Sequence, residues 1–296
     1  MSLQAFTLII LAGLIHSGWN IVAKKAGGDA RFSLYVSVFN ALIWAPLGWW
    51  LGTDAVPGWG WMEWGFVTAS AVLHVAYFVV LLRGYRVADL TVVYPLARGS
   101  GPLMSSLVAV LFLGEKISTL GAAGIAAVVL GVFLIAGGPR MIAAIRDGKN
   151  VEARQRVLAG LYYGLLTGMF IASYTVVDSY AVKMLLMSPI LVDYMGNLIR
   201  LVILAPLAAR DWPETKRLWR VQWRYAAVVA FFSPIAYVLV LYAVQSAPIS
   251  HVAPAREVSM LFAALIGGKL LGEGDRGLRI TGAIMIALGV TALGLG

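Results

Sequence analysis

Long apolar stretches separated by short polar connections dominate this chain. A helix that crosses a bilayer needs about 20 mostly apolar residues, and ten segments approach that length and composition. They cover residues 3–23, 32–52, 62–82, 89–113, 118–138, 157–182, 188–209, 225–245, 249–271 and 278–295. The two longest connections, 139–156 and 210–224, are polar and basic. The pattern predicts an all-α integral membrane protein with ten transmembrane helices and no soluble domain.

Four prolines interrupt or open two of these segments. Pro95 and Pro102 lie in the fourth, whereas Pro248 directly precedes the ninth and Pro254 lies near its start. Proline removes a backbone donor, and membrane helices tolerate it where neighbouring groups cover the freed carbonyl. We therefore expect the fourth and ninth helices to be irregular.

The second half of the chain repeats landmarks of the first half at an offset of 158 residues. The equivalent pairs are Arg98 and Arg256, Glu115 and Glu273 (each ending Leu-Gly-Glu), Gly124 and Gly282, and Gly131 and Gly289. A constant offset across several landmarks indicates two fused copies of one unit. The expected division is a first repeat over 1–138, a basic linker loop over 139–156, and a second repeat over 157–296.

Five helices per copy is an odd number, so the second copy must enter the membrane from the opposite side. The expected fold is therefore two inverted-topology five-helix repeats. In such proteins small solutes bind near the membrane midplane, where the two repeats meet.

The distribution of positive charge predicts the orientation of the chain in the membrane. The chain is 60% hydrophobic and only 12% charged, and its formal net charge is +9. Of its 23 Lys and Arg residues, 18 lie in odd-numbered connections, and two, Lys116 and Lys183, lie in even-numbered ones. The positive-inside rule then places the odd connections in the cytoplasm and both termini outside the inner (plasma) membrane. We interpret the positive charge as topology and contact with lipid headgroups, not as a nucleic-acid site.

The residues and motifs that several kinds of catalytic or metal site require are absent from this sequence. The chain has no cysteine, which excludes disulfides, zinc thiolate sites and thiol nucleophiles. It also lacks the GxxxxGK[ST], HExxH and GxSxG patterns of phosphate-binding loops, zinc proteases and serine hydrolases. We expect no cofactor, no metal and no enzymatic activity. Residues 1–23 lack a basic leading region, so they are predicted to be a transmembrane helix, not a cleaved signal.

The arrangement resembles the EamA-type members of the drug/metabolite transporter superfamily. The resemblance covers essentially the whole chain and rests on the two tandem repeats, on Leu-Gly-Glu closing the fourth helix of each, and on Gly18-Trp19-Asn20 in the first helix. It implies transport, with export driven by the proton gradient as the family-level expectation.

Two features depart from the family pattern. Relatives are commonly described with cytoplasmic termini, whereas the charge distribution predicts the reverse. The small multidrug members carry an essential glutamate in the first helix, which here has no carboxylate at all. A proton-coupled exporter of lipophilic cations is therefore the weaker expectation.

Polar side chains at membrane depth are functional candidates because burying them is costly. His16, Trp19 and Asn20 share one helical face, since they are spaced i, i+3, i+4. The equivalent positions in the second copy are Tyr174, Val177 and Asp178. We expect the two faces to meet across a central cavity, one aromatic and hydrogen-bonding, the other acidic. Alternatively, Asn20 and Tyr174 serve as polar contacts between helices, and Asp178 lies at a hydrated helix end.

Arg98 and Arg256 are the strongest substrate-binding candidates. They occupy equivalent positions in the two copies, and two guanidinium groups can clamp one anion with a planar geometry that lysine lacks. The alternative is that each arginine forms a structural ion pair. Glu257 is expected to point away from Arg256, because neighbours on a helix do not face each other.

Further candidates complete the expected cavity. Trp19, Tyr77, Tyr94 and Tyr237 are expected as its apolar walls. Asp178, Glu257 and His74 are the candidate proton carriers. Asp193, Asn197 and Arg200 are expected to form a self-satisfying structural stripe in the seventh segment, with Asp193 reaching Arg200 through Asn197.

The expected function is secondary active transport of a small polar anionic or zwitterionic metabolite, such as an amino acid, by alternating access. Export is the expected direction, and the partners are the solute, the lipid bilayer and protons. Two alternatives stay open: a multidrug exporter of lipophilic cations and an integral-membrane lipid-modifying enzyme. The enzyme would need one acid–base pair, whereas the repeat predicts Glu115 and Glu273 on opposite membrane faces.

Overall fold

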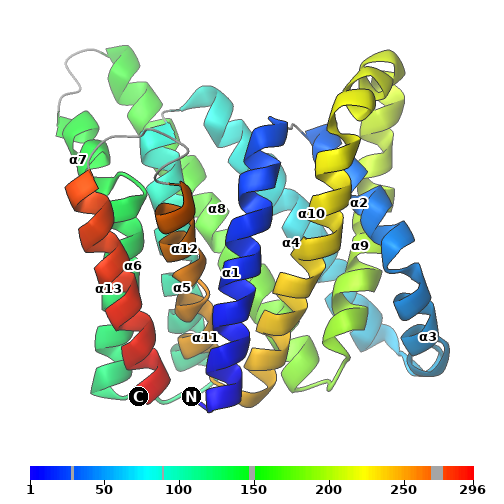
Figure 1. The fold of residues 1–296 in the computed structure, drawn as a ribbon, viewed down its shortest axis with the longest axis horizontal. Coiled ribbons are helices and arrows are strands. Elements are labelled where there is room, and N and C mark those ends of the chain that lie inside the picture. Colours follow the sequence, from blue (N-terminus) through cyan, green and yellow to red (C-terminus); the bar gives the residue numbers. More distant parts are fainter. Residues whose placement is uncertain (28–29, 89, 147–150, 268–275) are drawn as a thin grey trace.

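A computed structural model describes residues 1–27, 30–88, 90–146, 151–267 and 276–296. The helices, in chain order, are α1 (Leu3–Ala26), α2 (Ala30–Ile43), α3 (Ala45–Ala55), the 3₁₀ turn η1 (Val56–Gly58), α4 (Trp61–Val87), α5 (Leu90–Phe112), α6 (Thr119–Ile135), α7 (Gly138–Arg146), α8 (Val151–Lys183), α9 (Pro189–Arg210), α10 (Trp212–Ser246), α11 (Ile249–Ala255), α12 (Val258–Gly267) and α13 (Arg276–Leu295). No strand occurs in the described ranges, which confirms the all-α class. The long helices run side by side, and both termini lie at one end of the bundle (Figure 1).

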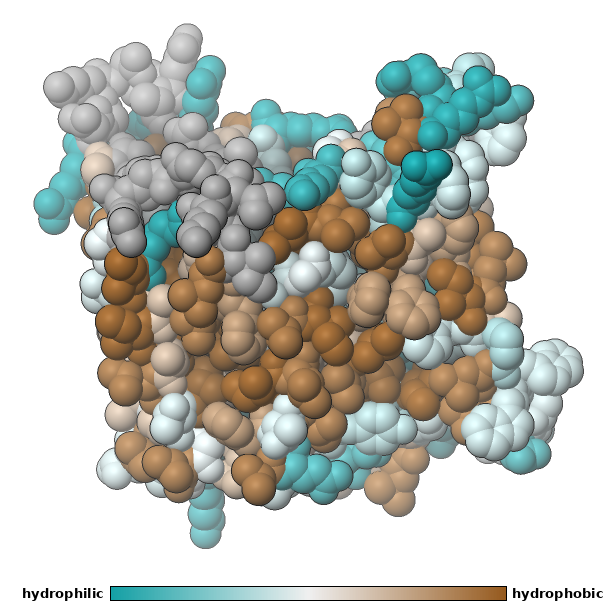
Figure 2. Space-filling view, viewed as in Figure 1, coloured by the Kyte–Doolittle hydropathy of each residue, from teal (hydrophilic) through white to brown (hydrophobic). Residues whose placement is uncertain are grey.

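The apolar surface matches a multi-pass membrane protein. A hydrophobic band crosses the middle of the bundle, and hydrophilic residues gather at both ends (Figure 2). Among the described residues, six helices are long and apolar enough to cross a bilayer, or seven if the bent pair α2 and α3 forms one span. Helix α6 is apolar but shorter, and the ninth predicted segment is split into α11 and α12. The exact number of ten spans therefore stays a prediction.

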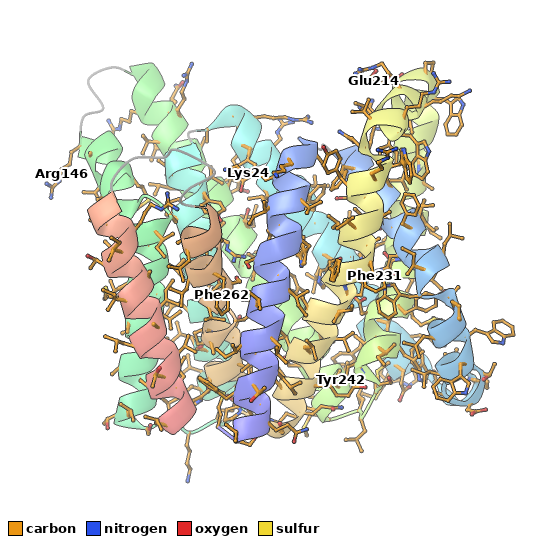
Figure 3. The ribbon with its side chains drawn as sticks, viewed as in Figure 1. Lys24, Arg146, Glu214, Phe231, Tyr242 and Phe262 are labelled. Atoms are coloured by element: carbon orange, nitrogen blue, oxygen red, sulfur yellow. The ribbon has the colours of Figure 1, made fainter. Side chains whose placement is uncertain are left out.

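Two predicted connections are largely helical. Helix α7 and the start of α8 occupy most of 139–156, and α10 begins at Trp212, within 210–224. Hydropathy identifies only the part of a helix that lies within the apolar band. Arginine, lysine and glutamate are themselves good helix formers, so these basic stretches extend helices beyond the apolar band. Lys24, Arg146 and Glu214 mark this charged end, opposite the termini (Figure 3).

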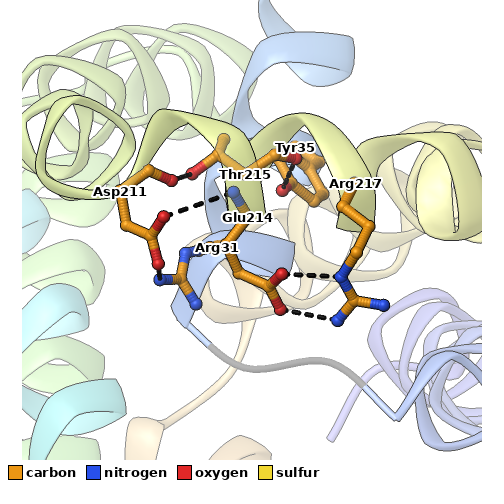
Figure 4. A network of polar contacts seen from close by, with 6 residues as sticks. All are labelled: Arg31, Tyr35, Asp211, Glu214, Thr215 and Arg217. Carbon is orange, nitrogen blue, oxygen red and sulfur yellow. Dashed lines mark hydrogen bonds and ion pairs between the residues drawn. The ribbon is translucent and has the colours of Figure 1, made fainter.

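A polar network ties the corner between α9 and α10 to the start of α2 (Figure 4). The Asp211 carboxylate pairs with Arg31 at 3.2 Å and accepts from the backbone N–H of Glu214 at 3.3 Å, which caps α10. The buried Tyr35 hydroxyl donates to the Thr215 carbonyl at 2.6 Å. Exposed ion pairs contribute little to stability, so the cap and the buried tyrosine bond fix this corner.

The last helices of the two copies, α6 and α13, cross at glycines. A Cβ atom on Gly131 would lie 2.6 Å from the Gly282 carbonyl oxygen, and one on Gly124 would lie 2.9 Å from that of Gly289. The reverse contacts are equally close, at 2.7 and 2.8 Å. Small residues allow such backbone approach between membrane helices. Gly124 thus meets the repeat equivalent of Gly131, and Gly131 meets the repeat equivalent of Gly124.

Proline shapes two other helices. Pro254 cannot donate to the Ser250 carbonyl, which instead accepts from the Ser106 hydroxyl at 3.1 Å. Tight i→i−3 bonds follow, from Glu257 N to the Pro254 carbonyl and from Met260 N to the Glu257 carbonyl, at 3.0 and 2.8 Å. The expected break in the ninth segment is thereby observed between α11 and α12. In contrast, α5 continues as one helix through both of its prolines.

Candidate functional site

The break between α11 and α12 places two charged residues beside the first repeat. Glu257 is 2% exposed, and its carboxylate lies 2.9 Å from the Arg98 guanidinium on α5. Its ion-pair partner is Arg98 of the first copy and not its chain neighbour Arg256. The ion pair neutralises Arg98 and joins the two copies, which is the alternative that the sequence left open for this arginine.

Arg256 differs from its repeat equivalent. Within the described ranges, no side chain forms an ion pair or hydrogen bond with its guanidinium. It lies within electrostatic range of Tyr174, Tyr237 and Glu257. Together with Ser179 and Tyr237 it lines a cavity of about 10 Å³, which is room for one water molecule. Arg256 therefore retains a full set of donors for a ligand.

The acidic side of the site comes from α8. Asp178 is 1% exposed, and its Oδ2 accepts a hydrogen bond from the Tyr237 hydroxyl of α10. Its Oδ1 is buried without a donor at full hydrogen-bond geometry among the described residues, although the Ser70 hydroxyl of α4 lies close to the carboxylate, and the neighbouring Ser179 hydroxyl is also unpartnered. A buried carboxylate oxygen without a donor is costly, so Asp178 has capacity for a cationic or donor group.

Aromatic rings surround this carboxylate. His74 of α4 stacks on Tyr174 with ring centroids 4.0 Å apart, and its edge meets Tyr237 at 5.7 Å. Tyr77 contacts Tyr174 edge-on at 5.9 Å. The His74 Nδ1 bonds the Ser70 carbonyl at 2.9 Å, which orients the ring. Helices α4, α8 and α10 thus form one aromatic wall.

The three candidate residues on α1 do not all lie near the arginines. His16 lies within electrostatic range of both Arg98 and Arg256, and its ring meets Trp19 edge-on at 4.6 Å. Trp19 packs toward Phe32 and Tyr35, with its buried Nε1 unpartnered among the described residues. Asn20 lies one position further and is exposed. His16 is thus the member of this face closest to the arginines.

Tyr94 of α5 connects the first copy to the second copy near Arg98. Its hydroxyl donates to the Met260 sulfur of α12 at 3.6 Å, and 37% of the residue is exposed. It stands within range of Arg98. Tyr94 therefore spans from the first copy to the broken helix of the second.

The stripe on α9 differs in detail from its prediction. Arg200 donates directly to the Asp193 carboxylate at 3.3 Å, without passing through Asn197. Asn197 instead donates to the Ser37 carbonyl of α2 at 3.1 Å. The i, i+7 spacing brings Arg200 back over Asp193 after two turns. Across the described chain, no group of three or more His, Asp or Glu side chains could hold a metal ion.

Comparison with known proteins identifies the architecture. The model of the EamA-like transporter family matches residues 3–137 and 158–295. The chain belongs to the EamA-like transporter family. The match repeats across both copies, and the family is part of the drug/metabolite transporter superfamily, so the chain is a membrane transporter. Members of this family are generally not enzymes.

Structural comparison agrees with this EamA-like assignment. A solved chain titled only "Crystal structure of protein" is similar, with a TM-score of 0.70 over 99% of this chain and 98% of that one. The two sequences are 15% identical, so the likeness concerns the fold alone. No curated protein matches the sequence.

One residue of this EamA-like transporter has a role that sequence reasoning missed. The Glu115 carboxylate accepts from the backbone N–H groups of Ile249 and Ser250, at 2.8 and 2.9 Å. It therefore caps the start of α11, where unpaired N–H groups and the helix dipole favour an anion. The repeated Leu-Gly-Glu was the available signal. The equivalent Glu273 lies outside the described residues.

Replacing Glu115 with alanine is expected to remove both capping bonds. The free energy of unfolding should fall by about 1–2 kcal/mol, the range for loss of a helix cap. Equilibrium unfolding in mixed micelles would measure it. Glu115→Gln retains one acceptor and should lose less. Equal stability of the wild type and Glu115→Ala would show that water replaces the cap.

Proposed function

We propose that this chain is a secondary active exporter of a small anionic or zwitterionic metabolite, such as an amino acid, that works by alternating access. The supporting observation is the Arg256 guanidinium, which has no partner among the described residues and lies in the repeat interface. Such a donor suits a carboxylate, which guanidinium groups bind with two parallel hydrogen bonds.

The balance of charges favours a zwitterion over a simple anion. Arg98 and Glu257 neutralise each other. That leaves Arg256 and Asp178, one cation and one anion, each with unused hydrogen-bonding capacity. Tyr237 stands between them, since it bonds Asp178 and lines the small cavity with Arg256. A solute carrying a carboxylate and an ammonium group would satisfy both.

The proposal includes ten spans arranged as two inverted repeats. The reciprocal glycine contacts of α6 and α13 support an approximate two-fold relation between the copies. Alternating access then consists of one repeat rocking against the other around a midplane site. The charge distribution supports odd connections in the cytoplasm and termini outside the inner membrane.

A matched ligand series tests the binding site. We expect an amino acid to raise the melting temperature of the purified protein more than its deaminated acid or its decarboxylated amine. At a hundredfold excess over Kd, a ligand of the folded state contributes about 2.7 kcal/mol. Arg256→Gln should abolish the response to the acid and Asp178→Asn the response to the amine. The exposed Arg217→Ala serves as control.

Other results of this series would redirect the assignment. Stabilisation by quaternary cations alone, unchanged in Arg256→Gln, would favour the multidrug exporter of lipophilic cations. The aromatic wall of Tyr77, Tyr174 and Tyr237 is the observation that favours this second candidate, because rings bind cations on their faces. A lipid-modifying enzyme gains no support from Glu115, since both its carboxylate oxygens accept backbone bonds.

Protons are the proposed coupling ion, and Asp178 is the first candidate carrier, ahead of Glu257 and His74. Asp178→Asn is expected to abolish solute accumulation driven by a pH gradient in proteoliposomes. Solute exchange at saturating concentration should persist, because exchange needs no net proton movement. Undiminished accumulation in this variant would exclude Asp178 and direct the same test to Glu257→Gln and His74→Gln.

A further inference from the structure

The two ends of the helix bundle differ in how tightly they are packed around the arginines. Helices α1 and α4 both run from the end that carries the termini, here called the termini end, to the charged end (Figure 1). The last buried residue of α1 is Ser17, and beyond Ala71 the described part of α4 buries only Gly84. All seven residues of α11, at the termini end, are buried. The bundle is therefore closed at the termini end and looser at the charged end.

A layer of apolar side chains closes the termini end. Val244 of α10 and Ile249 and Val252 of α11 line the small cavity of the candidate site, and each is at most 2% exposed. The opposite direction is less closed. The Arg98 side chain is 21% exposed, and Tyr94, one helical turn nearer the charged end of α5, is 37% exposed. The arginine site is therefore more accessible from the charged end.

Glu115 of the first copy holds helix ends of the second copy beside this layer. Its carboxylate accepts from the backbone N–H groups of Ile249 and Ser250 at 2.8 and 2.9 Å. It also lies 3.9 Å from the Lys183 ammonium group of α8, which donates to the Ala247 carbonyl at the end of α10 at 3.2 Å. Hydrogen bonds to a charged acceptor are stronger than neutral ones, whereas the Lys183 side chain is 35% exposed and its ion pair is weak. The start of α11 is therefore the main attachment.

We propose that Glu115 is the latch of a gate at the termini end, and that its bonds to the start of α11 keep this end closed while the arginine site is open to the charged end. The inference rests on alternating access, which belongs to the proposed function. Opening the termini end requires the apolar layer to part and the start of α11 to leave Glu115. The Glu115 side chain is 13% exposed, so water can replace its lost hydrogen bonds at a small net cost. The latch is therefore reversible.

Thiol labelling of the purified protein in lipid nanodiscs tests the latch. The chain has no cysteine, so one introduced cysteine reports on one end. With a hydrophilic maleimide, we expect Val244→Cys to react slowly and Tyr94→Cys to react rapidly. Adding Glu115→Ala should raise the Val244→Cys rate by about five- to thirtyfold, the population change for the loss of one helix cap. Glu115→Gln retains one acceptor and should raise this rate less.

Ser118→Ala is the matched control, because it removes the N-cap bond to the Gly121 N–H, which lies at the same end but within the first copy. It should leave the Val244→Cys rate unchanged. An equal rise in this control, or a parallel rise in the Tyr94→Cys rate, would show general loosening and overturn the latch. So would equal rates at Val244→Cys and Tyr94→Cys without Glu115→Ala, or no effect of Glu115→Ala. Labelling needs no solute, so failure of the latch is distinguishable from failure of the proposed function, which the ligand series tests.

Discussion

Replacing Arg98 with methionine is expected to lower the free energy of unfolding by about 3 kcal/mol, since removing one partner of a buried ion pair leaves an uncompensated charge. Here that charge is Glu257, which is 2% exposed and has Arg98 as its ion-pair partner in the described structure. Methionine keeps much of the apolar stem and removes the charge. Equilibrium unfolding in mixed micelles measures the loss.

The double variant Arg98→Met/Glu257→Gln separates charge from packing. It should recover most of the lost stability, because a neutral amide is cheaper to bury than an unpaired carboxylate. Glu257→Gln alone should be intermediate, since Arg98 is 21% exposed and retains some contact with solvent. If the double variant is as unstable as Arg98→Met, the defect is lost packing and the ion pair is a minor contributor.

The second large loss of stability is expected from substitutions at the crossing of α6 and α13. A Cβ on Gly131 would lie 2.6 Å from the Gly282 carbonyl oxygen and 2.9 Å from the Ile286 nitrogen. Both atoms belong to backbone, so the helices must separate. We expect Gly131→Ala to cost about 1–3 kcal/mol, the range for overpacking. Gly282→Ala should cost a similar amount, because the contact is reciprocal.

Gly65→Ala in α4 is the matched control. A Cβ there meets nothing within 4 Å, and alanine favours a helix over glycine by up to about 1 kcal/mol. The same unfolding measurement should show unchanged or higher stability. A loss in Gly131→Ala no larger than in this control would mean that the crossing accommodates the methyl group.

The apolar pattern was sufficient to predict the helices, because each segment's length and hydropathy are set locally by the bilayer, and the constant 158-residue offset between landmark residues predicted the repeat. The apolar pattern could not show which side chains on different helices would contact each other. Arg98 and Glu257 are 159 positions apart, and only the break after Pro254 turns the carboxylate toward α5. Similarly, Asn197 reaches Ser37 on another helix, although spacing along α9 suggested a local role. Contacts between helices depend on rotation about each axis, which hydropathy does not encode.

The aromatic candidates likewise show that the sequence did not determine which neighbouring helix each side chain contacts. Tyr174 and Tyr237 do lie around Asp178, since both face the point where α4, α8 and α10 meet. Trp19 instead packs against a cluster from α2 and α10, and Asn20 is exposed, although both share a face with His16. One helical face is broad enough to touch two different neighbours. The 158-residue offset identified the equivalent positions but not which neighbour each would meet.

The reciprocal glycine crossing also bears on how such a chain can originate. Because Gly124 meets Gly289 and Gly131 meets Gly282, the surface that one copy presents is the surface that the other copy requires. A surface complementary to itself is the one used by symmetric homodimers. If the two copies are inverted as proposed, a half-length ancestor that inserted in both directions would have carried this crossing already assembled between two separate molecules. Gene fusion would then have fixed the partner and left each half free to diverge, as Arg98 and Arg256 have in their pairing.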